Sequence, residues 1–180
     1  MGKYKIFFGM IAGALITVTP VAAQDPDSLE VQRQEHNQQA GTENLETLAL
    51  LLHQALQTNN PELLRRHLVD KRVYDKLMQL GTAPVRESLL LYSPTDLQLD
   101  FQQDFGQVMQ DGATLEVDWP TTSIKETIVA DTPPTRNAVI FPAQLHLNSS
   151  SGLPFQVHFT TARLDGRYYL LPPLRLSEEL

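Results

Sequence analysis

The hydrophobic period of this chain changes once, near Gly112, and this change sets its fold class. Before Gly112, apolar residues recur at the spacing of amphipathic helices, and after it they alternate as in half-buried strands. Helices that precede a run of strands are typical of α+β domains. We therefore predict an α+β fold in which N-terminal helices pack on an antiparallel sheet of about four strands.

Caps, prolines and turn residues divide the two halves into elements. Thr42 is a candidate N-cap for the first helix, and Asn60-Pro61 is a start signal for the second. The expected helical segments are 42–59, 60–81 with a break near 69, 84–90, and 93–112, and the expected strands are 115–119, 124–129, 139–147 and 155–159 followed by a last strand.

The last two strands are joined by Asp165-Gly166, two residues that tolerate the positive φ of a type I′ hairpin. This turn sets Leu164 opposite Arg167 and brings apolar residues together on one face, because a slip of one residue would move the whole set to solvent. The further expected pairs are Thr161 with Leu170, Val157 with Leu174, and Phe155 with Leu176.

This hairpin, Arg163-Leu164-Asp165-Gly166-Arg167-Tyr168-Tyr169-Leu170, resembles the final hairpin of the nuclear transport factor 2-like superfamily. The order of elements from Asn44 to Leu176 is also similar to that family. The resemblance implies a curved sheet that wraps the helices into a cone. Because the family includes isomerases, dehydratases, transport adaptors and exported modules, it leaves the function open.

Residues 1–23 have the pattern of an export signal: Lys3 and Lys5, an apolar stretch from 6 to 18, and the small residues Val21-Ala22-Ala23. The apolar stretch is shorter than the roughly 20 residues that span a membrane, and the chain has no cysteine to carry a lipid. We expect 1–23 to be a signal peptide, 24–41 a flexible polar lead-in and 42–180 a single domain. The protein should be soluble and periplasmic or secreted, with no stable membrane anchor.

Composition excludes several classes of function. The net charge of −7 at pH 7 argues against nucleic acid as a partner, because nucleic-acid binding depends on a positive field. Without cysteine the chain has no thiol nucleophile and no thiolate metal site. It also has no Gly-x-Ser-x-Gly, Ser-x-x-Lys or Gly-rich phosphate motif, so we predict no catalytic residue, no cofactor and no metal.

Two sets of ionisable residues have a regular spacing. His146 and His158 should share the outer sheet face as a solvated pair, with a weak zinc or copper site as the alternative. Asp96, Asp100 and Asp104 recur every four residues along one helix face. We expect that face to be solvated or internally paired, and the alternatives are a divalent cation or a basic partner.

The cone implied by the resemblance would place a pocket between the helices and the inward sheet face. The residues that could line this candidate cleft are Tyr74, Trp119, Phe141, Tyr168 and His67. We expect the aromatic residues to be plain core, because aromatic side chains dominate protein cores in general. We expect a mostly packed interior with at most a small apolar cleft near Tyr74 and Trp119.

The leading functional hypothesis is an exported soluble binding or interaction module without catalytic activity, whose partner is an unknown protein or a small apolar ligand. One alternative is a cavity-based small-molecule binder or isomerase-like enzyme, which would need an open pocket. Another is a periplasmic protector that neutralises a basic toxin through its acidic surface.

The export signal generates a direct test. When the full-length chain is expressed in a Gram-negative bacterium, intact-mass analysis of the exported protein should show an N-terminus near Gln24, because Val21-Ala22-Ala23 fits the cleavage site. Recovery of the full-length chain from the cytosol or the membrane would contradict this prediction.

Overall fold

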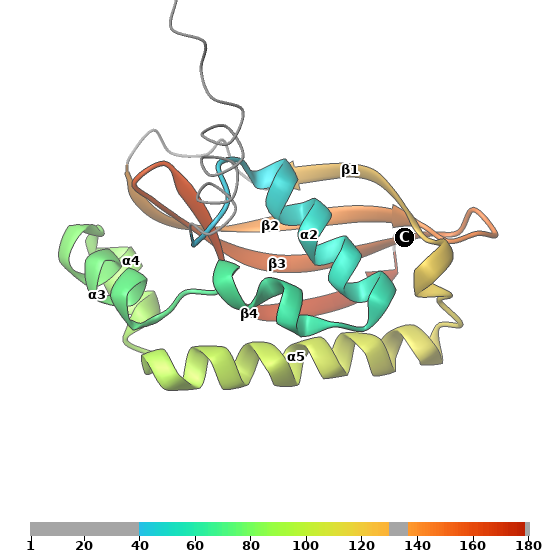
Figure 1. Ribbon diagram of the computed structural model, residues 1–180, viewed down its shortest axis with the longest axis horizontal. Helices are drawn as coiled ribbons and strands as arrows, with labels where there is room; N and C mark the ends of the chain where they lie inside the picture. Colours follow the sequence, from blue (N-terminus) through green and yellow to red (C-terminus); the bar gives the residue numbers. More distant parts are fainter. Residues whose placement is uncertain (1–39, 130–136, 179–180) are drawn as a thin grey trace, which may run out of the picture. The chain divides into compact units, whose positions relative to one another are not determined.

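The computed structural model describes residues 40–129 and 137–178, so the predicted signal peptide and nearly all of the predicted lead-in lie outside the described residues. Within them, helices precede a four-stranded antiparallel sheet, which confirms the predicted α+β class (Figure 1). The elements are α2 Leu45–Thr58, η1 Pro61–His67, α3 Lys71–Leu80, α4 Ala83–Leu89, α5 Pro94–Thr114, η2 Trp119–Thr121, β1 Ser123–Val129, β2 Ala138–Asn148, β3 Pro154–Leu164 and β4 Arg167–Glu178, with the strands in the order β1-β2-β3-β4.

The start of the first helix differs from the prediction. Asn44, and not Thr42, caps α2, and its side chain accepts a hydrogen bond from the backbone N–H of Thr47 at 2.7 Å. Thr42 instead forms an antiparallel bridge with Tyr168 of β4. The segment after Asn60 is a 3-10 helix, η1, where we had predicted an α-helix.

The sheet is packed on both faces. The larger cluster joins α2, α5 and the face formed by alternate residues of β2, β3 and β4, and Figure 1 shows α2 crossing the sheet. The smaller cluster lies on the opposite face near the β3–β4 turn, where α3 and α4 cover Ala138, Ala162 and Leu164. Alternate residues of one strand therefore enter different cores, as the two-residue period of a strand requires.

Helix α5 runs beside β4, and one of its carboxylates bonds to that strand. Asp104 Oδ2 accepts a hydrogen bond from the backbone N–H of Leu174 at 2.9 Å. Asp96 lies in the first turn of α5, where a carboxylate is favoured by the positive end of the helix. Asp104 is thus paired within the fold.

The predicted strand over 115–119 is wrong. Helix α5 continues through Gly112 to Thr114, and Trp119 begins the short helix η2. Gly112 permits a close approach: a Cβ there would lie 2.5 Å from Trp119 Nε1. The alternation of Leu115, Val117 and Trp119 lies in a turn, in which Leu115 is exposed, Val117 is half-buried and Trp119 is buried in the larger cluster.

The hairpin register is confirmed near its turn and shifts beyond it. Asp165 and Gly166 both have positive φ, and Leu164 pairs with Arg167 and Thr161 with Leu170. A bulge at Pro172-Pro173 then changes the register, because proline has no N–H to continue the ladder. The observed pairs are Phe159 with Leu174, Val157 with Leu176, and Phe155 with Glu178. Because the shift is even, the apolar residues keep their face.

Two glycines of α5 should respond oppositely to the same substitution. Gly112→Ala should lower the free energy of unfolding by about 1–3 kcal/mol, because the new methyl group would overlap the Trp119 ring. Gly106→Ala is the matched control: its Cβ would meet nothing within 4 Å, so it should stabilise by about 0.5–1 kcal/mol through helix propensity. Urea denaturation measures both, and equal effects would contradict the packing of Trp119 on α5.

Candidate functional site

A pocket of about 400 Å³ lies between the β3–β4 turn and the first turns of α3. Its volume is within the range of small-molecule sites. We call it the hairpin pocket, and it is lined by Ala40, Asp70, Arg72, Val73, Lys76, Leu164, Asp165, Arg167 and Tyr169. Three cationic side chains, two carboxylates and a phenol therefore meet at one place.

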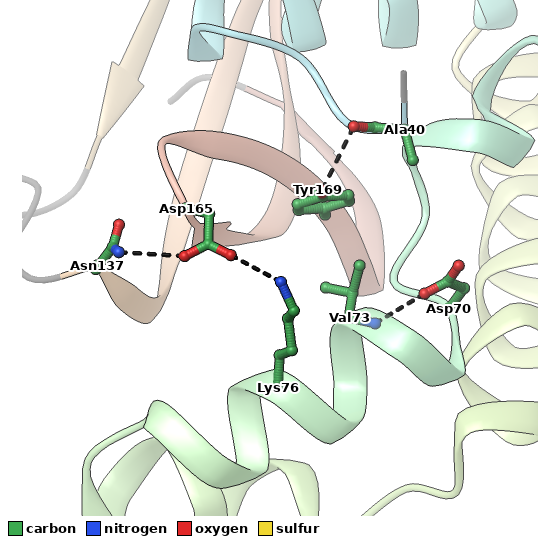
Figure 2. Close-up of polar contacts among 7 residues, drawn as sticks. All are labelled: Ala40, Asp70, Val73, Lys76, Asn137, Asp165 and Tyr169. Atoms are coloured by element: carbon green, nitrogen blue, oxygen red, sulfur yellow. Dashed lines mark hydrogen bonds and ion pairs between the residues drawn. The ribbon is translucent and has the colours of Figure 1, made fainter. Parts of the chain in front are cut away.

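The tight turn places the Asp165 carboxylate between two donors (Figure 2). Lys76 Nζ of α3 lies 3.0 Å from Oδ2, and Asn137 Nδ2 donates to Oδ1 at 3.2 Å. Both oxygens of Asp165 are thus engaged. The Lys76–Asp165 ion pair is half-exposed and contributes about 0–1 kcal/mol, so its main effect is to tie α3 to the hairpin.

Asp70 forms the opposite side of the pocket as the N-cap of α3. Its Oδ1 accepts a hydrogen bond from the backbone N–H of Val73 at 2.8 Å, as Figure 2 shows. Arg72 follows in the first turn of α3 and is exposed. One carboxylate oxygen of Asp70 is therefore committed to the helix end, while the Arg72 side chain is accessible to a ligand.

Tyr169 supplies the phenol of the pocket. Its ring lies against Gly41, where a Cβ would be 2.7 Å from Cζ, and its hydroxyl donates to the carbonyl of Ala40 at 3.4 Å. Burial raises the pKa of Tyr169 above 10.0, although the nearby Arg167 charge opposes this effect. The phenol stays protonated at neutral pH, as its hydrogen bond to the carbonyl of Ala40 requires.

The five residues of the predicted cleft do not meet in one cleft. Tyr74 packs on the smaller cluster, and its hydroxyl donates to the carbonyls of Leu89 and Tyr92, both at 3.1 Å. Trp119 and Phe141 belong to the larger cluster on the other sheet face. Only Phe141 and Tyr168 are in ring contact, edge to face at 6.4 Å.

His67, the fifth predicted residue, is half-buried at the end of η1. Burial lowers the pKa of His67, a hydrogen bond to the backbone of Gly41 opposes this shift, and the charges of Arg167 and Arg66 add to it. The imidazole therefore lies in a cationic environment next to the hairpin pocket without being part of its lining.

His53 is a buried ionisable residue that we did not single out from the sequence. Its Nε2 lies 2.8 Å from Thr122 Oγ1, and that hydroxyl itself donates to the carbonyl of Trp119 at 2.8 Å. Because the single hydroxyl proton is used, His53 Nε2 must be the donor. Burial lowers the pKa of His53, and a hydrogen bond to the backbone of Thr122 partly opposes the shift. Its position on the apolar stripe of α2 was the sequence feature that could have indicated its burial.

The expectation of a solvated histidine pair is wrong for His146, which is only 5% exposed. The register places His146 opposite Gln156 and His158 opposite Gln144, so the two histidines are diagonal neighbours. His158 is half-buried, and its Nε2 lies 2.8 Å from Ser177 Oγ of β4. In the described part of the chain, no group of three or more His, Cys, Asp or Glu could hold a metal ion.

Two further pockets lie away from the hairpin. The open-face pocket, about 440 Å³, is on the outer sheet face and is lined by Pro142, Ala143, His158, Phe159, Thr160, Pro173, Arg175, Leu176 and Ser177. The end pocket, about 320 Å³, lies where α5 ends and combines Glu116 and Glu178 with the exposed Leu153.

The hairpin pocket combines residues that the sequence analysis treated separately. Asp165 and Arg167 belong to the predicted hairpin, whereas Arg72 lies in the helical half of the chain. Their distance along the chain hid their proximity. The available signal was the Asp-Gly turn, which fixes where Arg167 and Tyr169 lie on β4.

Comparisons with protein families, with characterised proteins and with solved structures found no match to this chain. Among residues 40–129 and 137–178, no helix combines the length and the apolar character that crossing a membrane requires.

The two histidines with lowered pKa predict how stability depends on pH. Unfolding restores their usual pKa of 6.5, so between 6.5 and the lower folded pKa the unfolded chain binds more protons. The free energy of unfolding should therefore be highest above pH 6.5 and fall as the pH falls below it. Urea midpoints from pH 7.5 to 5.0 measure this loss. His53→Gln should flatten the curve, and an unchanged slope in His53→Gln/His67→Gln would contradict the assignment.

Proposed function

We propose that this protein is an exported binding module without catalytic activity, and that the hairpin pocket binds a small organic anion, a carboxylate with a short apolar group. The observation that carries the proposal is the convergence of Arg72, Lys76 and Arg167 with the Tyr169 phenol on one pocket. The N-terminal sequence supports export.

The sign of the pocket favours an anion. It has three cationic side chains against Asp70 and Asp165, in a chain whose net charge is −7. Both oxygens of Asp165 already accept hydrogen bonds, and one oxygen of Asp70 caps α3. An arriving carboxylate would therefore meet mainly donors, and an arginine fork can hold it with two parallel hydrogen bonds.

The walls of the pocket favour an apolar group beside the carboxylate. Val73, Leu164 and the ring of Tyr169 line it, and Leu164 and Tyr169 are largely buried. Each apolar square ångström removed from water adds about 25 cal/mol to binding. A purely apolar ligand, one of the two kinds of partner that we expect from the sequence, would leave the charged rim desolvated and without a partner.

The interior offers the isomerase-like alternative less support. Phe101 and Phe159 fill the space between helices and sheet and are almost completely buried. The buried His53 is bonded to Thr122, and the interactions of His67 are with Gly41 and with arginines. An acid–base mechanism would require such a histidine to face a carboxylate or a substrate proton.

Sodium benzoate is a suitable probe for the hairpin pocket. It should raise the melting temperature by mass action and bind with a dissociation constant that isothermal titration calorimetry can measure. Arg72→Gln should weaken binding by about tenfold, because a hydrogen bond to a charged group contributes about 1.5–3 kcal/mol.

Lys71→Gln is the matched control. Lys71 is the neighbouring residue and also cationic, but its side chain is 77% exposed, pairs with Asp75 at 2.7 Å and does not line the pocket. It should leave benzoate affinity within about twofold of the wild-type value. Equal losses in the two variants, or no binding to the wild-type protein, would reject the proposed ligand class.

A further inference from the structure

Among the described residues, helices pack on the outer face of the sheet at its hairpin end. There the smaller cluster ends at Ile140, Ala162 and Leu171. Further along the same face, Thr160, His158 and Arg175 line the open-face pocket. This part of the face is formed by the adjacent strands β2, β3 and β4, and side chains held on strands keep more precise positions than side chains on loops.

The bulge at Pro172-Pro173 produces the hollow. It separates the pair Thr160–Leu171 from the pair Phe159–Leu174, so the β3–β4 ladder is interrupted between them. Pro173 lines the pocket at this interruption. A bulge often marks a place where a sheet redirects side chains beside a functional site.

The polar groups of the pocket are nearly all hydrogen-bond donors. Arg175 lies directly opposite His158 across the two strands, and Ser177 is one step further on the same face. Arg175 is exposed, and the lining residues include neither Asp nor Glu. A guanidinium, an imidazole and two hydroxyls without a carboxylate form a donor set for an oxyanion.

We propose that the open-face pocket is a second anion site, independent of the hairpin pocket, which binds a carboxylate or phosphate group through Arg175, Ser177 and His158. A hydrogen bond of 2.8 Å joins His158 Nε2 to Ser177 Oγ. In the absence of an anion, either atom can be the donor. A bound anion that accepts the Ser177 proton requires Nε2–H of His158 to donate to Ser177, so binding selects that protonation pattern.

Other charged groups on this face are further away. Glu126 of β1 is opposite His146, and β2 separates it from the strand of His158. Two strand spacings are about 10 Å, close to one Debye length at 0.1 M salt, so Glu126 opposes an anion only weakly.

The test is NMR of the full mature chain labelled with ¹⁵N-histidine, titrated at pH 7.5 and constant ionic strength with sodium phosphate or with sodium acetate. We expect the His158 ring nitrogens to move toward the Nε2–H pattern with at least one of the two anions. A response to phosphate alone would identify the ligand group as a phosphate, and a response to acetate alone would identify it as a carboxylate. A response to both would show that the site accepts either oxyanion. An unchanged His158 spectrum with both anions would overturn the proposal.

Three variants separate this site from the hairpin pocket. Arg175→Gln should weaken binding of the anion by about tenfold, because it removes the guanidinium group from an exposed position. Ser177→Ala should abolish the change in the His158 protonation pattern. A change caused by ionic strength alone would persist in this variant. Arg72→Gln is the matched control and should leave the titration unchanged. Wild-type affinity in Arg175→Gln would overturn the proposal, whether or not benzoate binds at the hairpin pocket.

Discussion

Strand β4 lies at one end of the strand order, so its outer backbone groups need partners from outside the sheet. Three separate segments supply them. Thr42 exchanges backbone hydrogen bonds with Tyr168 at 3.0 and 2.9 Å, the N–H of Val69 donates to the carbonyl of Leu170 at 3.1 Å, and Asp104 accepts from the N–H of Leu174. The helical half is thus attached to the sheet half along one edge, and an edge that could pair with another chain is covered.

This attachment explains where the hairpin pocket forms. Thr42 pairs with Tyr168 of β4 and Leu68 pairs with Leu170, and these pairings bring the nearby Ala40 and Asp70 to the pocket that Tyr169 lines. Helix α3 then starts beside the turn, and Lys76 reaches Asp165. The charged groups converge because backbone pairing places them, while the half-exposed ion pair itself adds little stability.

The sequence predicted the elements whose signals are local. Asp165-Gly166 predicted a turn with positive φ, and alternation predicted β2 and β3. The sequence-based prediction failed where a contact between separated residues determines the structure. Gly112 looks like a helix stop, but its role is to leave space for the ring of Trp119, seven residues further along the chain. For the same reason the hairpin pocket could not be predicted, since Arg72 and Tyr169 line one pocket only because β4 pairs with Thr42 and Leu68.

The proline pair in β4 connects the edge to the open face. Because neither proline can donate to the ladder, β3 and β4 lose their pairing between Phe159 and Thr160, and the register shifts by an even number of residues. On the edge side, the N–H of Leu174 that follows the prolines is satisfied by Asp104 of α5. On the open face, the same shift sets Arg175 opposite His158 and Ser177 within hydrogen-bond distance of it.

The register on the hairpin side of the bulge shows what the prolines change. Thr160 faces Leu171 there, and a ladder continued in that register would put position 173, and not Arg175, opposite His158. Residues with a backbone N–H in place of both prolines would allow the ladder to continue in this way. The donor set of the open-face pocket therefore depends on two residues that contribute no hydrogen-bond donor themselves.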